Sequence, residues 1–225
     1  MRLALLLALA LPLAAAAQDD DTLFGAGVRT RPKFDGSSER TVDLIPVVRY
    51  YGRPWFARTT QGLLEGGARW NLRPGLDTGV QLAYEQGPLD HDPDASIGVH
   101  LEADGTIGPA PVNGLLRVRQ HVNTHRGTQL DARGTVGVYG GHGIAAGVFA
   151  QATWASEKSF EAYYGVHQSG LLFVSLGLLG SYDLTQRWML VASVERRRLG
   201  DDAAASPVVE RRSAVYANAG IAYRF

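Results

Sequence analysis

The sequence predicts an all-β chain that folds as an antiparallel, up-and-down transmembrane β-barrel. Apolar residues recur at every second position along most of the chain, which is the period of a strand with one apolar face. The strand-like segments run to roughly 10 to 13 residues, which suits a tilted membrane strand better than a soluble sheet. The chain also stops on a strand-like segment that ends in an aromatic residue, Phe225.

The composition excludes several classes of function. The 22 basic and 22 acidic side chains balance, so no basic excess is available to neutralise phosphates, and no nucleic-acid partner is expected. A chain without cysteine has no disulfide, thiolate nucleophile or cysteine-based zinc site. Its 27 glycines and 20% charged residues argue against both a helix bundle and a disordered chain.

The N-terminal residues resemble a secretory signal peptide. Arg2 supplies a positive charge, Leu3–Leu13 is an apolar run, and Ala15–Ala17 fits the small-residue cleavage pattern. The apolar run is too short to cross a bilayer as a helix. We therefore expect residues 1–17 to be a signal peptide and residues 18–225 to form one barrel domain in the cell envelope.

The apolar face of these strands is expected to point outward, toward lipid. In one segment Leu130, Ala132 and Val136 alternate with Asp131 and Arg133, and both a soluble barrel and a membrane barrel can bury such a strand. The segment lengths favour the membrane barrel. Aromatic residues near the expected strand ends would form its interfacial girdles, namely Trp55, Phe56, Trp70, Tyr84, Trp154 and Trp188.

Twelve strands account for the pattern. They are expected at residues 22–31, 41–51, 54–61, 63–72, 75–85, 96–106, 111–123, 128–139, 143–155, 170–182, 186–196 and 213–225. Short links alternate with generally longer ones, as short periplasmic turns alternate with outer loops in bacterial barrels. The third and fourth strands are the weakest, and merging them would give a ten-stranded barrel instead.

The C-terminal third contains three distinctive motifs, YYGV at Tyr163–Val166, YDLTQRW at Tyr182–Trp188 and RLGDDAAASPVVE at Arg198–Glu210, followed by a closing strand. In these motifs the chain resembles the MipA/OmpV family of MltA-interacting outer-membrane proteins. In the last motif the matching residues are Arg198, Leu199, Gly200, Asp201, Ser206 and Pro207. PVVRYYG at Pro46–Gly52 and the later Phe56 match the early part of the family pattern more loosely.

The resemblance implies a non-enzymatic scaffold in the outer membrane of a Gram-negative bacterium. The barrel would lie in outer-membrane lipid, and its protein partners would be a lytic murein transglycosylase and a bifunctional penicillin-binding protein. These enzymes would bind at periplasmic turns such as 107–110, 140–142 and 183–185. Short turns make a standard interface of about 800 Å² per partner hard to build. The terminal strand, with Ile221, Tyr223 and Phe225 on one face, resembles the signal that the barrel assembly machinery recognises.

The inward face suggests an alternative, a narrow pore or uptake barrel for small solutes. Charged and histidine side chains on four sequential strands would point into the lumen and form cross-strand ion pairs, either as simple filling or as a selective constriction. These are Asp77, Glu85, His100, Glu102, Asp104, Arg117, Arg119, His121, Asp131 and Arg133. A third alternative, adhesion through loops 156–169 and 197–212, rests on their length alone.

No combination of residues suggests catalysis, a metal site or a cofactor. The pair within His91–Asp94 lies in one proline-broken loop and has no partners from a second loop. His121 and His125 have helical metal spacing but fall on a strand and its turn, where they would not converge. Neither Ser169 nor Ser206 has an acid–base pair nearby.

Overall fold

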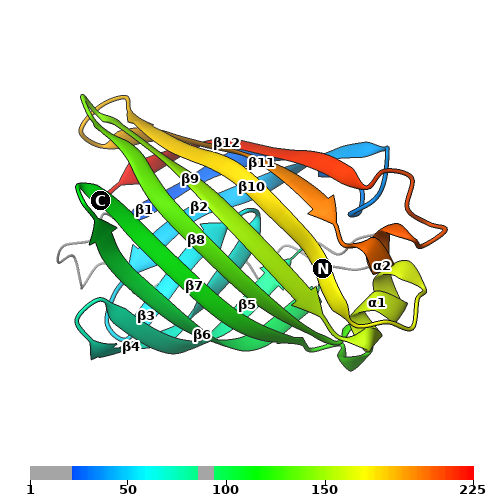
Figure 1. The fold of residues 1–225 in the computed structure, drawn as a ribbon. Helices are drawn as coiled ribbons and strands as arrows, with labels where there is room; N and C mark the ends of the chain where they lie inside the picture. The colour runs from blue at the N-terminus through cyan, green and yellow to red at the C-terminus, as the bar shows by residue number, and fades with distance from the viewer. Residues whose placement is uncertain (1–21, 86–93) are drawn as a thin grey trace, which may run out of the picture.

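The computed structural model describes residues 22–85 and 94–225, which form one closed β-barrel of tilted strands (Figure 1). Twelve strands lie in these residues: β1 (Leu23–Pro32), β2 (Arg40–Tyr51), β3 (Trp55–Thr60), β4 (Leu63–Arg73), β5 (Leu76–Glu85), β6 (Asp94–Ile107), β7 (Ala110–His121), β8 (Thr128–Gly141), β9 (Ile144–Ala155), β10 (Gly170–Asp183), β11 (Trp188–Leu199) and β12 (Ser213–Arg224). The predicted signal peptide lies outside the described residues.

Every strand pairs antiparallel with its neighbours in the chain, and β1 closes the barrel against β12 from Leu23↔Arg224 to Thr30↔Ala217. The predicted up-and-down barrel of twelve strands is therefore confirmed. The ten-stranded alternative is wrong, because β3 and β4 are separate strands that pair from Trp55↔Ala68 to Thr60↔Leu63. The β2–β3 ladder is short, with three paired positions from Arg49↔Arg58 to Tyr51↔Phe56.

The apolar face points outward on every side of the barrel. Leu44 is 83% exposed, Leu176 66% and Ile97 56%, whereas Glu65 and Asp131 inside the barrel are each 1% exposed. A soluble barrel would reverse this arrangement, because water favours polar groups outside and apolar groups inside. The distribution matches a barrel that is surrounded by lipid.

One of the predicted girdle residues does not face lipid. Trp55, Trp70 and Trp154 are 63%, 51% and 39% exposed, and Tyr84 and Trp188 are also exposed. The prediction was wrong for Phe56, which is 4% exposed and lies edge-on to His100, with ring centroids 5.3 Å apart. Trp55 and Phe56 are consecutive in β3, so the strand pleat sends them to opposite faces.

The two ends of the barrel differ. Short turns join β2 to β3, β4 to β5, β6 to β7, β8 to β9 and β10 to β11 at the end where Leu23 pairs with Arg224. Because outer-membrane barrels keep short turns on the periplasmic side, we call this the periplasmic end and the opposite one the outer end. The outer end carries a 3-10 turn at Thr124–Arg126 and two helices, α1 (Glu157–Tyr164) and α2 (Asp201–Ala204). No helix in the described ranges is long and apolar enough to cross a membrane.

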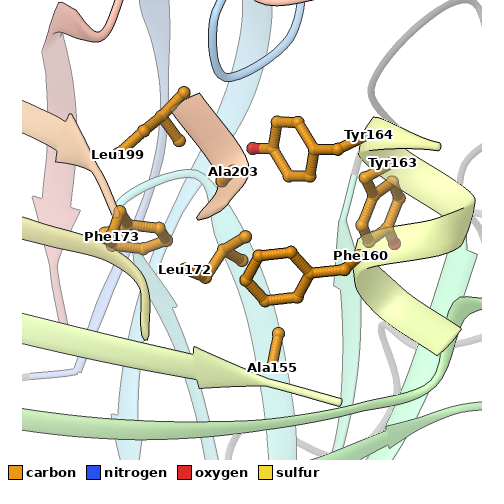
Figure 2. Close-up of a cluster of buried hydrophobic side chains, with 8 residues drawn as sticks. All are labelled: Ala155, Phe160, Tyr163, Tyr164, Leu172, Phe173, Leu199 and Ala203. Carbon is orange, nitrogen blue, oxygen red and sulfur yellow. The ribbon is translucent and has the colours of Figure 1, made fainter. Parts of the chain in front are cut away.

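An apolar cluster fixes α1 and α2 to the outer end (Figure 2). Phe160 of α1 is fully buried, and Leu172 of β10, Leu199 of β11 and Ala203 of α2 belong to the same cluster. The Ser206 hydroxyl donates to the Tyr164 carbonyl at 2.5 Å, which joins the segment after α2 to the C-terminus of α1. Burial in this cluster raises the pKa of Tyr164 well above its usual value.

The family-motif residues lie at or next to this outer-end cluster. Leu199 is part of the cluster itself. Gly200 leaves no room for a side chain, because a Cβ there would collide with the Leu171 carbonyl oxygen. Asp201 begins α2 and pairs with Arg212, while Arg198 and Pro207 are exposed.

Candidate functional site in the barrel lumen

A network of buried ion pairs crosses the middle of the lumen. We call it the lumen network, and its charged members are Arg58, Glu65, Glu102, Arg117, Arg119 and Asp131. Arg58 Nε lies 2.5 Å from Glu65 Oε1, and Arg117 Nη1 lies 2.6 Å from Glu65 Oε2. Arg117 Nη2 then reaches Asp131 Oδ2 at 2.8 Å. The network therefore links β3 and β4 to β7 and β8.

Neutral side chains add hydrogen bonds to the lumen network. The Gln81 amide donates to Glu65 at 3.1 Å, and the Thr153 hydroxyl donates to Asp131 at 2.7 Å. Arg119 donates to Gln129 at 2.9 Å. A buried carboxylate is tolerated only when it is paired and hydrogen-bonded, so these contacts hold Glu65 and Asp131 in place as anions.

A second set of charges lies toward the outer end. Arg197 Nη1 contacts Asp35 Oδ2 at 2.8 Å, and Arg197 Nε contacts Glu195 Oε1 at 3.3 Å. The same guanidinium stacks on Phe173 and Tyr216, at 4.0 and 4.3 Å from the ring centroids. These contacts fix Arg197 in position, because cation–π stacking and charge-assisted hydrogen bonds to two carboxylates both restrict a guanidinium.

The tip of the β3–β4 hairpin, Gln61 and Gly62, bends into the lumen. Both residues have left-handed backbone angles, with φ of 53° and 82°. The Gln61 amide donates to Glu195 Oε2 at 3.0 Å, although β3 and β11 are four strands apart around the barrel. A Cβ at Gly62 would collide with the Arg29 guanidinium, so glycine lets Arg29 pass directly over the hairpin.

The hairpin tip lies between two cavities. An outer cavity of about 150 Å³ extends beneath α1, and Tyr163 and Tyr164 contribute to its wall. A periplasmic cavity of about 910 Å³ lies on the other side and includes Arg133 and Phe149 in its wall. Thr60, Gln61 and Gly62 line both cavities. The lumen is thus divided into two chambers at the hairpin tip.

Two lumen arginines, Arg29 and Arg133, make no ion pair with a carboxylate in the described part of the chain. Arg29 lies over Tyr216 at 5.3 Å, and its buried Nε has no hydrogen-bond partner. Arg133 lies over Phe149 at 4.2 Å, and its Nε is likewise buried without a partner. Each of the two chambers therefore has one arginine without a direct carboxylate contact, because Arg29 lines the outer cavity and Arg133 the periplasmic cavity.

The structure brings together some, but not all, of the residues predicted for the lumen. Glu102, Arg117, Arg119 and Asp131 belong to the lumen network. Asp104 adjoins it, because Asn113 donates at 2.9 Å to both Glu102 and Asp104. Arg133 lies apart, on the Phe149 ring.

The remaining predicted residues lie outside the lumen network. His100 is buried against Phe56. Asp77 accepts a hydrogen bond from Asn71 at 2.9 Å near the periplasmic end of β5. His121 is fully buried near the outer end and lies 3.0 Å from Asp94. Glu85 is the last residue of β5 and pairs with Asp94, and the structure does not describe its side chain.

Several site residues were not predicted from the sequence, namely Arg29, Asp35, Arg58, Gln61, Glu65, Glu195 and Arg197. Glu195 lies on the inward face that the alternation of β11 indicates, so the alternation alone could have identified it. Arg58 and Glu65 fall on the two strands with the weakest pattern. Gln61 lies in a turn, where strand alternation carries no signal.

The residues that were weighed for catalysis do not converge on a cavity. Asp94 contacts His121 and, at 3.4 Å, Arg126, while His91–Pro93 lie outside the described residues. Ser206 donates its hydroxyl proton to the Tyr164 carbonyl in the outer-end cluster. Across the described ranges, no cluster of three or more histidine or acidic side chains could hold a metal ion.

The closed barrel, its lipid-facing apolar surface and its polar lumen define an outer-membrane β-barrel of a Gram-negative bacterium. The chain belongs to the family described as MltA-interacting protein MipA, whose model matches residues 24–225. No curated protein matches the chain.

Two solved structures are similar to the whole fold. The NanC porin is 12% identical, with a TM-score of 0.58 over 90% of this chain and 100% of that one. The COG4313 outer membrane channel from Pseudomonas putida F1 is 9% identical, with a TM-score of 0.57 over 95% of this chain and 99% of that one. At these identities the likeness concerns the barrel fold alone.

Proposed function

We propose that this protein is a non-enzymatic outer-membrane barrel that passes small solutes through a narrow, gated lumen. The observation that carries this proposal is the shared wall of the two cavities, because Thr60, Gln61 and Gly62 line both. A displacement of this hairpin tip, together with the lumen network beside it, would join the chambers into one passage. The similar folds that are named a porin and a channel are consistent with this function.

The hydrogen bond from Gln61 to Glu195 would hold the gate closed. Gln61→Asn keeps a residue that tolerates the left-handed backbone but shortens the side chain by one methylene, so it cannot reach Glu195 in the same backbone position. We expect Gln61→Asn to raise the open probability of the refolded barrel in a planar lipid bilayer. Gln186→Asn, at an exposed periplasmic turn, is the matched control and should behave as the parent. Absence of conductance from the parent and from Gln61→Asn would refute the pore.

A second candidate function is a scaffold for peptidoglycan-remodelling enzymes, which the family description favours by naming interaction with MltA. A lytic murein transglycosylase and a bifunctional penicillin-binding protein would bind at turns 107–110, 140–142 and 183–185. Replacing these turns with Gly-Ser sequences of equal length should abolish capture of the two purified enzymes by the folded barrel. Lys158→Ala, at the exposed surface of α1, should leave capture unchanged. Capture that survives all three turn replacements would argue against this site.

Two proposals concern biogenesis. Residues 1–17 would direct export and be removed, which mass spectrometry of the mature N-terminus would test. Ile221, Tyr223 and Phe225 would be recognised by the barrel assembly machinery. Tyr223 lies edge-on to Phe225, with ring centroids 5.0 Å apart, and Phe225 is 74% exposed. Deleting Phe225 should slow assembly in cells, whereas Val208→Ala in the outer loop should not.

A further inference from the structure

We propose that the outer cavity is a binding site for a small organic monocarboxylate, with Arg29 as the residue that holds the carboxylate. This inference rests on the proposed pore function in one respect: it names the class of solute that the pore would pass. Binding in the outer cavity does not itself require conduction.

Arginines outnumber acidic side chains in the wall of the outer cavity, where Asp35 and Asp131 are the two acidic residues among those described. Five arginines line it, Arg29, Arg31, Arg117, Arg119 and Arg197. Four of them have carboxylate partners: Arg31 contacts Asp43 at 2.6 Å, Arg197 contacts Asp35 and Glu195, and Arg117 and Arg119 contact Asp131. Arg29 has no such partner among the described residues. A guanidinium withdrawn from water needs a counter-charge, so the cavity favours an anion.

Arg29 is held in place for such a role. Its guanidinium lies against Gly62 and over the Tyr216 ring. Arg197 also stacks on Tyr216, with its Cζ atom 4.3 Å from the ring centroid. One aromatic ring therefore positions two guanidinium groups beside the same cavity. A planar, fixed guanidinium can bind a carboxylate through two parallel hydrogen bonds, which favours this anion over a spherical one.

The other side chains of the cavity wall determine which group can be attached to the carboxylate. Phe34, Leu172 and Phe173 supply apolar surface, while Gln129 and Gln151 supply amide groups. A cavity of about 150 Å³ is the size that accommodates a benzene ring. The preferred ligand is therefore a monocarboxylate whose apolar part is no larger than one aromatic ring.

Calorimetric titration of the detergent-folded full barrel with benzoate tests the proposal. Benzoate should bind, and benzamide, which has the same shape without the charge, should bind at least tenfold more weakly. Inorganic phosphate distinguishes an organic carboxylate site from a general anion site. Equal or tighter binding of phosphate, or binding of benzamide as tightly as benzoate, would overturn the proposal.

Arg29→Gln should weaken benzoate binding at least tenfold, and Arg29→Lys should weaken it less, because it keeps the charge but loses the paired donors. Arg133→Gln is the matched control, since Arg133 is also a lumen arginine without an ion pair among the described residues, but it lines the periplasmic cavity and not the outer one. Benzoate affinity should be unchanged in this variant. Heat-dependent mobility on gels would establish that each variant is folded. Should Arg29→Gln misfold, Arg29→Lys and the benzamide comparison still decide the outcome.

The same samples separate this inference from the pore. Benzoate binding that depends on Arg29 in a barrel without conductance would support the binding site and refute the pore. Conductance in a barrel that does not bind benzoate would support the pore and refute the binding site.

Discussion

The Gln61 side-chain amide donates a hydrogen bond of 3.0 Å to Glu195 Oε2, which joins the tip of the β3–β4 hairpin to β11 across the lumen. The two residues are 134 positions apart in the chain. Glu195 also contacts Arg197, whose second carboxylate partner is Asp35. A displacement of the hairpin tip would therefore remove a partner from a buried carboxylate, which couples the position of the tip to the charges around the outer cavity.

Gly62→Ala should destabilise the barrel more than Gly108→Ala. Both glycines have positive φ, 82° and 60°, so each substitution carries the left-handed backbone cost of about 1–2 kcal/mol. A Cβ at Gly108 meets nothing within 4 Å, whereas one at Gly62 collides with the Arg29 guanidinium. The difference in unfolding free energy between the two variants isolates the contact with Arg29. Urea unfolding in detergent micelles measures it, and equal losses would show that the contact is unimportant.

Glu65→Gln should cost about 3–5 kcal/mol of unfolding free energy, because it removes the negative charge that Arg58 and Arg117 share. Both guanidiniums would remain buried with one carboxylate fewer between them. Glu161→Gln, on the exposed side of α1, is the matched control and should change stability by less than about 0.5 kcal/mol. A loss below about 1 kcal/mol for Glu65→Gln would mean that water or a moved side chain replaces the lost charge.

The sequence predicted the strands and their faces, but it did not predict the contacts that form the site in the lumen. Strand alternation is a local property, so residues such as Leu130 and Asp131 reveal their faces without knowledge of their neighbours. The lumen network depends on which strands approach each other across the barrel, and Glu65 meets Arg117 over a separation of 52 residues. No local pattern encodes that distance. Phe56 shows the same limit, since an aromatic residue near a strand end suits a girdle and a lumen wall equally well.

The outer end illustrates a different limit. The segment 156–169 was predicted only as a long loop, and it contains α1, whose eight residues are too short to be stable as an isolated helix. Phe160 and Tyr164 stabilise it by packing against Leu172 and Leu199, which lie on two other strands. The helix therefore depends on tertiary contacts rather than on its own sequence.

Phe160→Ala should loosen the outer end without unfolding the barrel. The side chain is fully buried, and replacing a buried phenylalanine by alanine costs about 3–5 kcal/mol. This free energy is lost from the apolar cluster that holds α1, so α1 should detach from the barrel. Trypsin should then cleave after Lys158 in the folded protein. Val208→Ala, in the same outer loops but exposed, is the control and should resist cleavage as the parent does. Cleavage at equal rates in parent and Phe160→Ala would show that the cluster does not restrain α1.

The opposite orientations of Trp55 and Phe56 can be tested by fluorescence. The four tryptophans are Trp55, Trp70, Trp154 and Trp188, and all are exposed on the lipid-facing surface of the barrel. Vesicles of brominated lipid should therefore quench the parent strongly, because quenching requires contact with the lipid chains. In a background with all four replaced by phenylalanine, Phe56→Trp should fluoresce without being quenched, since Phe56 lies inside the barrel against His100. Restoring Trp55 alone in that background should return the quenching. Strong quenching of Phe56→Trp would instead place this position at the lipid surface and return Phe56 to the girdle.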